Sequence, residues 1–472
     1  MPAHHFSNHR LAATLALLLW LAACGAATAP VPPAKAVAPA ANQAASALTG
    51  QYPDFFQAQG QAAQAVRTKL EQAFMQLFHG DPATQALYFA DGQNSHGTKA
   101  YILDVNNNDV RSEGMSYGMM IAVQLNKKAE FDALWNWAYS QMYHTDPTHP
   151  AYGYFAWSVS TQGVANDEMP APDGEEYFAT ALYFAATRWG DGSGIYQYKA
   201  KADELLTQMR HRQIIKRTTE RGEQAATALF HPDYAMVRFT PDLAHADHTD
   251  ASYHVPAFYE VWARLGPEAD RAFWRTAAGA SRAYFSKAAH PKTGLTPEYG
   301  NFDGSPWAAP WRPDSVDFRF DAWRSAMNWS VDWHWWRQNP DAVGLSSRLQ
   351  DFFFRAGLGS YGSQYSLDGK NLDAAKAAGP TAGPTAGPTA GLVAMNAVAS
   401  LASNHPQSGQ FVEALWQQPI PTGRYRYYDG MLYLLGLLHV SGEFKAWLAP
   451  QAKAPQITAP QAVADVLTDK SQ

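Results

Sequence analysis

Residues 321–336 read Asp-Ala-Trp-Arg-Ser-Ala-Met-Asn-Trp-Ser-Val-Asp-Trp-His-Trp-Trp, and apolar side chains recur there at every third or fourth position. This spacing places them on one face of an α-helix and predicts a helix over residues 322–336. The same period appears in further segments, among them residues 62–78, 131–142, 177–189, 257–265, 273–285 and 427–439. With weaker candidates the total reaches about twelve helices between residues 53 and 440, without βαβ alternation.

Twelve helices in a chain of this length can close as six inner and six outer helices around one core. The predicted fold class is therefore all-α, with a single domain over residues 51–450. Glycines at positions 80, 266 and 357 stand where helix C-caps are expected, which supports the helix ends at these points.

Composition excludes several classes of protein. The chain has 472 residues, 46% of them hydrophobic and 17% charged, which is ample for a large buried core. A formal charge of −6 and the lack of a basic tract argue against a nucleic-acid partner. Aromatic residues are abundant, with 16 Trp, 23 Tyr and 23 Phe. Most of these rings are expected to fill the core, and some to bind the C–H faces of sugar rings.

The N-terminus has the pattern of an export signal. A polar start, an apolar run over residues 11–21 and small residues before Cys24 predict a signal peptide over residues 1–24. Leu-Ala-Ala-Cys24 resembles a bacterial lipobox, and Cys24 is the only cysteine. We expect an exported protein, periplasmic or anchored in the outer membrane only through a lipid at Cys24; a soluble secreted protein is the alternative.

The Ala/Pro-rich composition at both ends predicts two segments outside the domain. Residues 25–50 are interpreted as a tether and residues 451–472 as a disordered tail. An Ala-Gly-Pro-Thr repeat that begins at Ala378 indicates a surface loop between two helices, because Gly and Pro in every unit exclude a helix.

Two distant segments each carry a carboxylate in an aromatic setting, and two carboxyl groups facing one another across a cleft suit the hydrolysis of a glycosidic bond. The first candidate is Glu113, near the start of an apolar periodic segment, where it could equally complement the helix dipole. The second is Asp321, which could instead be a helix N-cap. Asp317, four residues earlier, is its rival.

A third acidic segment runs from Asp173 to Glu176 and opens another predicted helix. Asp173 at the N-cap and Glu176 at the third helical position would form a capping box. A carboxylate at a helix start can also accept hydrogen bonds from sugar hydroxyls, and both interpretations can hold together.

Other patterns in the sequence are candidate binding sites. Trp157, Tyr117 and Trp323 are candidate sugar platforms, with core packing as the alternative for each. His245-Ala-Asp-His248 lacks partner ligands at a recognisable spacing, so we expect no metal site. No nucleotide or dinucleotide fingerprint stands in a suitable context, and we expect no cofactor.

Taken together, these segments resemble glycoside hydrolase family 8. The matching stretches are residues 112–119, 171–178, 188–192, 253–256, 294–299, 321–324 and 426–429. The resemblance covers the chain from about residue 53 to 448, and the fuller match is similar to the xylan-active branch, especially reducing-end xylose-releasing exo-oligoxylanases.

The resemblance implies an (α/α)6 barrel with an open cleft that acts on β-1,4-linked glycans with inversion. On the matching positions it implies Glu113 as general acid and Asp321 as general base, which demotes Asp317. Asp173 would hold and distort the sugar. The expected substrate-binding residues are Asp173, Tyr117, Trp157, Trp323, Arg324 and Tyr253. The expected partner is a β-1,4-linked xylo-oligosaccharide, and the protein is expected to be a monomer.

One departure concerns the mode of action. Exo-acting members carry a Leu-His-Pro just before the stretch that matches Gly391, and its histidine helps to close the leaving-group side of the cleft. The Ala-Gly-Pro-Thr repeats occupy that place here. Endo-1,4-β-xylanase and β-1,4-glucanase activity therefore remain alternatives, and a glycan-binding protein without catalysis is the alternative of another class.

Overall fold

The computed structural model describes residues 44–219, 222–373 and 388–448. Within these residues the chain forms twelve α-helices of nine or more residues. They are α3 (Ala63–His79), α4 (Ser112–Gln124), α5 (Lys128–Gln141), α6 (Pro172–Trp189), α7 (Tyr198–His211), α8 (Pro256–Leu265), α9 (Arg271–Ala288), α10 (Trp323–Trp336), α11 (Asp341–Ala356), α13 (Ala390–Val398), α14 (Ser408–Gln417) and α15 (Arg426–Val440).

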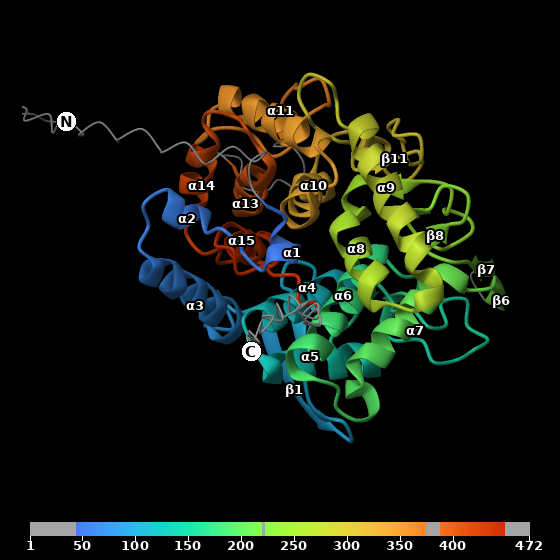
Figure 1. Ribbon diagram of the computed structural model, residues 1–472. Helices are drawn as coiled ribbons and strands as arrows, with labels where there is room; N and C mark the ends of the chain where they lie inside the picture. The colour runs from blue at the N-terminus through green and yellow to red at the C-terminus, as the bar shows by residue number, and fades with distance from the viewer. Residues whose placement is uncertain (1–43, 220–221, 374–387, 449–472) are drawn as a thin grey trace, which may run out of the picture. The chain divides into compact units, whose positions relative to one another are not determined.

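The helices form two concentric rings (Figure 1). In the inner ring α4, α6, α8, α10, α13 and α15 each contact the next, and α15 returns to α4. The outer helices α5, α7, α9, α11, α14 and α3 pack against these inner helices in the same order. This arrangement is an (α/α)6 barrel, and it confirms the prediction of six inner and six outer helices.

The burial of each ring follows its sequence. All fourteen residues of α10 and all nine of α13 are buried, because an inner helix is covered by neighbours on every side. The outer helix α3 buries a single stripe and leaves a mostly polar face exposed. The predicted helix over residues 322–336 is thus confirmed as α10, and Gly80, Gly266 and Gly357 directly follow α3, α8 and α11.

Short strands occupy several of the connections, which the all-α prediction did not include. An antiparallel five-stranded sheet is formed by β1 (Tyr88–Asn94), β2 (Gly97–Asp104), β3 (Asp109–Arg111), β4 (Ser158–Val159) and β5 (Ala165–Asp167). Three two-stranded pairs complete the set: β6 (Ile215–Thr219) with β7 (Gly222–Ala226), β8 (Phe230–His231) with β9 (Met236–Val237), and β10 (Thr249–Asp250) with β11 (Tyr299–Gly300). Strand β3 runs directly into α4, so the sheet fixes the start of an inner helix.

The predicted boundary of the tether at residue 50 is wrong. Residues Ser46–Thr49 form the short helix α1, which contacts α10. The Ser46 side chain is buried, and its Oγ lies 3.0 Å from Nε2 of His334 near the end of α10. The folded part therefore begins before residue 51, because a free tether would leave the Ser46 side chain exposed to solvent.

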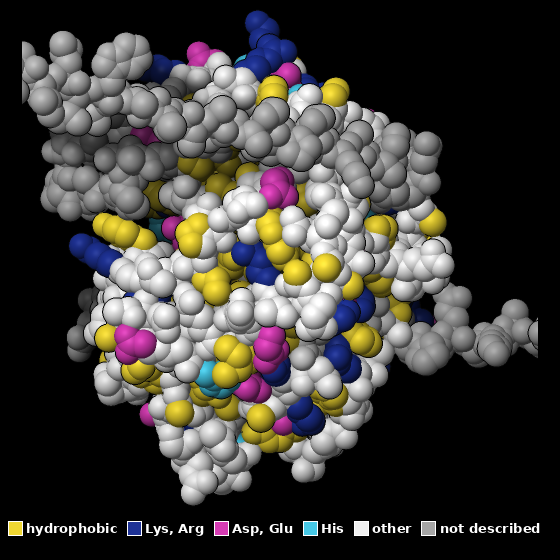
Figure 2. All heavy atoms as spheres, turned by 90° about the vertical axis from the view of Figure 1, so that its left-hand side faces the viewer, with side chains coloured by type: hydrophobic (Ala, Val, Ile, Leu, Met, Phe, Trp, Pro, Cys, Tyr) yellow, Lys and Arg dark blue, Asp and Glu magenta, His cyan; other side chains and the backbone are white. Residues whose placement is uncertain are grey.

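The remaining terminal predictions lie outside the described residues: the signal peptide at 1–24, most of the tether and the tail at 451–472. Among the residues that are described, no helix combines the length and the apolar composition needed to cross a membrane. On the face shown in Figure 2, hydrophobic side chains lie in small groups between polar and charged ones.

Candidate active site

The starts of inner helices bring the candidate residues together. Glu113 lies in the first turn of α4, Asp173 in the first turn of α6 and Arg324 in the first turn of α10. Asp321 lies in the one-turn 3-10 helix η6 (Phe320–Ala322) that leads into α10. The N-terminus of a helix carries a partial positive charge, so this end of the barrel favours carboxylates.

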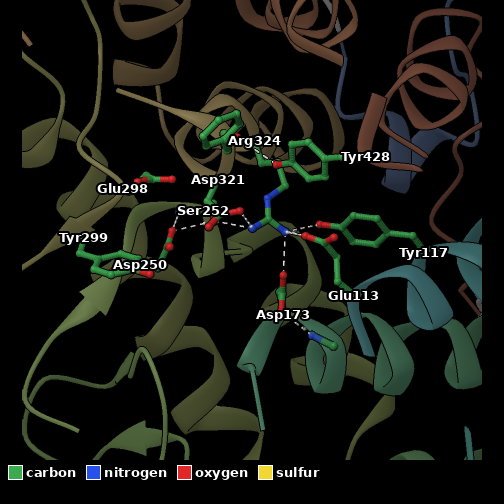
Figure 3. A network of polar contacts seen from close by, with 12 residues as sticks. Glu113, Tyr117, Asp173, Asp250, Ser252, Glu298, Tyr299, Asp321, Arg324 and Tyr428 are labelled. Carbon is green, nitrogen blue, oxygen red and sulfur yellow. Dashed lines mark hydrogen bonds and ion pairs between the residues drawn. The ribbon is translucent and has the colours of Figure 1, made fainter. Parts of the chain in front are cut away.

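Arg324 joins these side chains, and its guanidinium stands at the centre of Figure 3. Its Nη1 donates to Oε2 of Glu113 at 3.1 Å, to Oδ2 of Asp173 at 2.7 Å and to the hydroxyl of Tyr117. The Arg324 side chain is only 2% exposed. A cation buried to this degree is stable only because several acceptors surround it.

The other terminal nitrogen of Arg324 serves the second candidate. Nη2 donates to Oδ1 of Asp321 and to Oγ of Ser252, both at 3.0 Å. Because the guanidinium is small and planar, the two sets of contacts limit the separation between Oε2 of Glu113 and Oδ1 of Asp321 to about 8.5 Å. The prediction that the two carboxyl groups converge is thus consistent with the contacts.

Glu113 is placed to hold a proton near neutral pH. Burial raises the pKa of Glu113 to about 7; the Arg324 cation opposes this shift, and the charges of Asp173 and Asp321 add to it. Its side chain is 16% exposed, and its Oε1 accepts a 3.0 Å hydrogen bond from the Tyr427 hydroxyl. A carboxyl with these surroundings can serve as an acid at physiological pH.

Asp321 has a more open environment. Its side chain is 26% exposed, so water can reach it. The N-cap of α10 is Ala322, and Asp321 makes no capping bond to that helix, so its reading as a mere N-cap is wrong. The backbone carbonyl of the rival Asp317 accepts the N–H of Glu298 at 3.1 Å. It is the carboxylate of Asp321 that contacts the Arg324 guanidinium.

The capping-box interpretation of Asp173 is also wrong. Helix α6 begins two residues earlier than predicted, with Ala171 as N-cap and Pro172 at the first helical position, where proline is favoured. Glu176 instead accepts a 2.6 Å hydrogen bond from the Tyr259 hydroxyl. Asp173 is buried, and burial raises its pKa against the influence of the Arg324 guanidinium.

Comparison with known proteins agrees with this geometry. The family model described as "Glycosyl hydrolases family 8" matches residues 99–442, which is most of the chain. The chain belongs to glycosyl hydrolase family 8. The solved structures of this family are (α/α)6 barrels, in agreement with the fold of this chain.

Curated relatives of this family 8 protein include two enzymes named as reducing-end xylose-releasing exo-oligoxylanases. The one from Paenibacillus barcinonensis is 42% identical over 84% of this chain and 97% of its own length. The one from Halalkalibacterium halodurans is 38% identical over 84% of this chain and 95% of its own length.

Among solved structures, a family 8 protein from Teredinibacter turnerae in complex with xylobiose is 58% identical, with a TM-score of 0.81. The match covers 85% of this chain and 99% of that one. A second structure, described as a catalytic mutant xylanase in complex with xylohexaose, is 57% identical with the same TM-score.

The three predicted aromatic platforms of the family 8 chain differ in exposure. Tyr117 and Trp323 are buried; Tyr117 reaches the site through its hydroxyl, and Nε1 of Trp323 donates to the carbonyl of Ser363 at 3.0 Å. Trp157 is half-buried, with the Arg111 guanidinium 5.4 Å from its ring centre. Of the three rings, that of Trp157 is the most open to a ligand.

Tyr253, a predicted substrate-binding residue, lies next to Arg324. Its ring centre is 5.9 Å from the guanidinium carbon of Arg324, and Tyr428 stands at the same distance. Phe239 stacks nearly parallel to Tyr253, with the ring centres 6.1 Å apart. Aromatic rings around a cation add attraction and exclude water from its faces.

Sequence reasoning missed four polar residues of the site. Ser252 and Tyr427 directly contact the constellation of Glu113, Asp173, Asp321 and Arg324, whereas Asp250 and Glu298 lie on the Asp321 side of it in Figure 3. One signal in the sequence could have found them. Each lies in or near a segment that contains a predicted site residue or that matches the family. Their partners belong to other elements, so no spacing along the chain could reveal the contacts.

The histidines considered as metal ligands pack instead. Nδ1 of His245 lies 3.0 Å from Oδ2 of Asp242, and the ring of His248 stacks on Trp307 with centres 3.7 Å apart. Across the described ranges, no group of three or more His, Cys, Asp or Glu side chains is arranged to hold a metal ion.

Proposed function

We propose that this family 8 protein hydrolyses β-1,4-xylosidic bonds in xylo-oligosaccharides with inversion, and releases xylose from the reducing end. The observation that carries the proposal is the placement of Glu113 and Asp321 on the two terminal nitrogens of one guanidinium, that of Arg324. Two carboxyl groups held at a fixed spacing are the catalytic requirement of this reaction.

Glu113 acts as the general acid. Its raised pKa keeps a proton on the carboxyl near neutral pH. Oε2 of Glu113 accepts from Arg324 and Oε1 accepts from the Tyr427 hydroxyl. The carboxyl group gives its proton to the glycosidic oxygen as the bond to the anomeric carbon breaks.

Asp321 acts as the general base. It takes a proton from a water molecule, whose oxygen then attacks the anomeric carbon on the face opposite the leaving group. Inversion needs carboxyl groups about 6.5–9.5 Å apart to admit this water, whereas retention needs about 5–5.5 Å. The upper limit of about 8.5 Å set by Arg324 accommodates the inverting arrangement.

Asp173 and Arg324 complete the site. Arg324 offsets the negative charges of Asp173 and Asp321, and that of Glu113 once it has given up its proton. Without the cation these charges would repel one another in a desolvated space. Asp173 accepts a hydrogen bond from Nη1 of Arg324, the nitrogen that also contacts Glu113. It is placed to accept a further hydrogen bond from a hydroxyl group of the sugar at the cleavage point.

The names of relatives support xylan as the substrate class. Three curated relatives at 36–42% identity are named reducing-end xylose-releasing exo-oligoxylanases. Relatives named endoglucanases are at most 25% identical over at least 70% of this chain. The chain is thus much more similar to the exo-oligoxylanases than to the endoglucanases, and this difference supports xylose units over glucose units as the substrate.

A second mode of action, internal cleavage of xylan, is favoured by one specific observation. The Teredinibacter turnerae protein described as a xylanase is 57% identical, more than the exo-acting relatives. The Ala-Gly-Pro-Thr repeats also stand where exo-acting members carry Leu-His-Pro. Residues 374–387 of that segment lie outside the described part of the chain.

Product analysis decides between these functions. The purified protein is incubated with xylotriose, xylohexaose, xylan and cellulose, and products are followed by chromatography and by proton NMR of the anomeric signal. We expect xylose and a shortened chain from each oligosaccharide, with the new reducing end in the α configuration at first. Internal fragments from xylan would favour the endo mode; no cleavage by an otherwise folded protein would support a glycan-binding role.

We also propose that the chain is exported and acts as a monomer, held at a membrane by a lipid at Cys24. The support is the signal-like sequence before Cys24 and a catalytic constellation assembled within one chain. The Cys24→Ser variant should move from the membrane fraction to the soluble fraction of cells, and light scattering should give the mass of one chain. An unchanged membrane fraction would contradict lipidation.

A further inference from the structure

Asp250 and Ser252 form a buried pair beside the catalytic constellation. Asp250 ends β10, and Ser252 lies in the 3-10 helix η3 (Ala251–Tyr253) that follows. Oδ1 of Asp250 accepts two hydrogen bonds from Ser252, one from its N–H at 2.7 Å and one from its hydroxyl at 2.6 Å. Both side chains are buried.

The Ser252 hydroxyl links Asp250 to the catalytic groups (Figure 3). A hydroxyl has a single hydrogen, and here Asp250 receives it, so the oxygen presents its lone pairs to Arg324. Nη2 of Arg324 donates to this oxygen at 3.0 Å and to Asp321 at 3.0 Å. Both hydrogens of Nη2 therefore form hydrogen bonds: one binds Ser252 and fixes the guanidinium, and the other binds Asp321, the proposed base.

The backbone of Ser252 is fixed as well. Its carbonyl accepts a 2.7 Å hydrogen bond from Nδ2 of Asn328, one turn after Arg324 on α10. The hydroxyl is thus held from two sides, by Asp250 and by the helix that carries Arg324. A rigid acceptor of this kind leaves the guanidinium few alternative positions.

The second oxygen of Asp250 suggests that the carboxyl is neutral. Oδ2 is buried and has no hydrogen-bond partner among the described residues. Burial, with the charge of Asp321 as a further contribution, raises the pKa of Asp250 well above its usual range. A proton on Oδ2 would avoid a second negative charge beside Asp321 and leave Oδ1 free to accept from Ser252.

We propose that Asp250 is a positioning residue that orients the Ser252 hydroxyl. The oriented hydroxyl holds the Arg324 guanidinium in the position that fixes the distance between the carboxyl groups of Asp321 and Glu113. The kinetic consequence rests on the proposed function. Asp250 itself touches none of the reacting atoms, and a neutral Asn should replace it because only the acceptor Oδ1 is needed.

A local role offers a different account, since Asp250 also caps η3 through the Ser252 N–H. The chain contains a matched pair that separates the two roles. Oδ1 of Asp303 accepts from the N–H of Ser305 at 2.8 Å and from its hydroxyl at 2.6 Å, in an exposed loop. The Ser305 hydroxyl accepts from Asn301 rather than from an arginine of the site.

The test compares kcat and KM on xylotriose for five variants: Asp250→Ala, Asp250→Asn, Ser252→Ala, the double variant Asp250→Ala/Ser252→Ala, and Asp303→Ala. We expect Asp250→Ala and Ser252→Ala to lower kcat by about tenfold to a hundredfold, with KM nearly unchanged. The double variant should lose no more than either single one, because both remove the same link. Asp250→Asn should lose less than about threefold, and Asp303→Ala should match the wild type.

Full kcat in Ser252→Ala would overturn the proposal, because that variant keeps the cap and loses only the link to Arg324. Asp250→Asn as impaired as Asp250→Ala would overturn it too, since the charge would then be needed. Ser252→Ala also serves where Asp250→Ala fails to fold.

Crystal structures of Asp250→Asn, Ser252→Ala and Asp303→Ala give a readout that does not depend on hydrolysis. The guanidinium of Arg324 should be displaced in Ser252→Ala and unchanged in the other two variants. An unmoved guanidinium in Ser252→Ala would refute the positioning role. A wild-type protein that leaves xylotriose intact would instead refute the proposed function, and the structures would still test the link.

Discussion

Glu113 and Asp321 come from opposite halves of the chain, yet each accepts a hydrogen bond from a terminal nitrogen of the same guanidinium. Arg324, which supplies it, is the fourth residue of the segment that begins with Asp321. The two carboxyl groups are therefore not placed independently. Any displacement of Arg324 changes the distance between them, and the positions of Glu113 in the first turn of α4 and of Asp321 in η6 limit how far each side chain can follow.

Neutral replacements of the two carboxyl groups should abolish most turnover without unfolding the protein. Glu113→Gln cannot supply a proton and Asp321→Asn cannot accept one, so kcat on xylotriose should fall by about a hundredfold to ten-thousandfold in each. A reducing-sugar assay measures the loss, and circular dichroism checks the fold. Asp317→Asn is the matched control and should keep at least half of the activity. An equal loss in Asp317→Asn would contradict the assignment of the base.

Removal of Arg324 should destabilise the protein in a pH-dependent manner. In Arg324→Met three carboxylates lose their shared cation, and the free energy of unfolding at pH 8 should fall by about 3–5 kcal/mol. Burial already raises the pKa values of Glu113 and Asp173, and without the cation they rise further, so the penalty should be smaller at pH 5 than at pH 8.

Arg324→Lys separates charge from geometry in the same measurement. It keeps the cation but lacks the planar fork, so we expect it to recover part of the stability at pH 8 and little of the turnover. Denaturant unfolding at the two pH values measures the stability. Equal losses in the Met variant at pH 5 and pH 8 would show that the three carboxylates do not depend on the cation.

The alkaline limb of the pH–activity profile should report Glu113. Its pKa of about 7 predicts that kcat/KM falls above about pH 7, since the acid must carry its proton. Asp173→Asn removes a negative charge that raises this pKa, so the midpoint should move to lower pH. Arg111→Gln removes a positive charge that lowers it, so the midpoint should move to higher pH. Shifts in the same direction would contradict this electrostatic account.

The helices were predictable because their signal is local. The apolar period of residues 322–336 specifies α10 to within one residue, and the glycine after α3 marks its end. Strands β10 and β11 have two residues each, too few for an alternating pattern to show. The start of α6 was misjudged although Pro172, a favoured first helical residue, stood in the sequence.

The candidate site was only half predictable for a different reason. Glu113, Asp173 and Asp321 could be selected as carboxylates near helix starts, and the structure brings all three to one cation. That Arg324 is the cation, and that Ser252 holds it, depends on how the barrel closes. A hydrogen bond between residues of different helices leaves no spacing in the sequence from which it could be inferred.

A buried carboxyl on α6, that of Glu175 two residues after Asp173, should limit stability at high pH. Oε1 of Glu175 accepts the N–H of Phe155 at 3.0 Å, whereas Oε2 is buried without a partner among the described residues. Burial raises the pKa of Glu175 to about 8. The folded state then binds more protons than the unfolded state between about pH 4.5 and 8, so the contribution of Glu175 to stability is complete below pH 4.5 and is lost as pH rises through 8.

Glu175→Gln removes this titration while its amide oxygen can still accept from Phe155. At pH 5 the variant should unfold at nearly the same temperature as the wild type, because both side chains are neutral. At pH 9 it should be more stable by roughly 2–4 kcal/mol, since the wild type must bury a charge or release it by local opening. Thermal unfolding at both pH values measures the difference, and parallel pH dependence of the two proteins would mean that Glu175 does not titrate in this range.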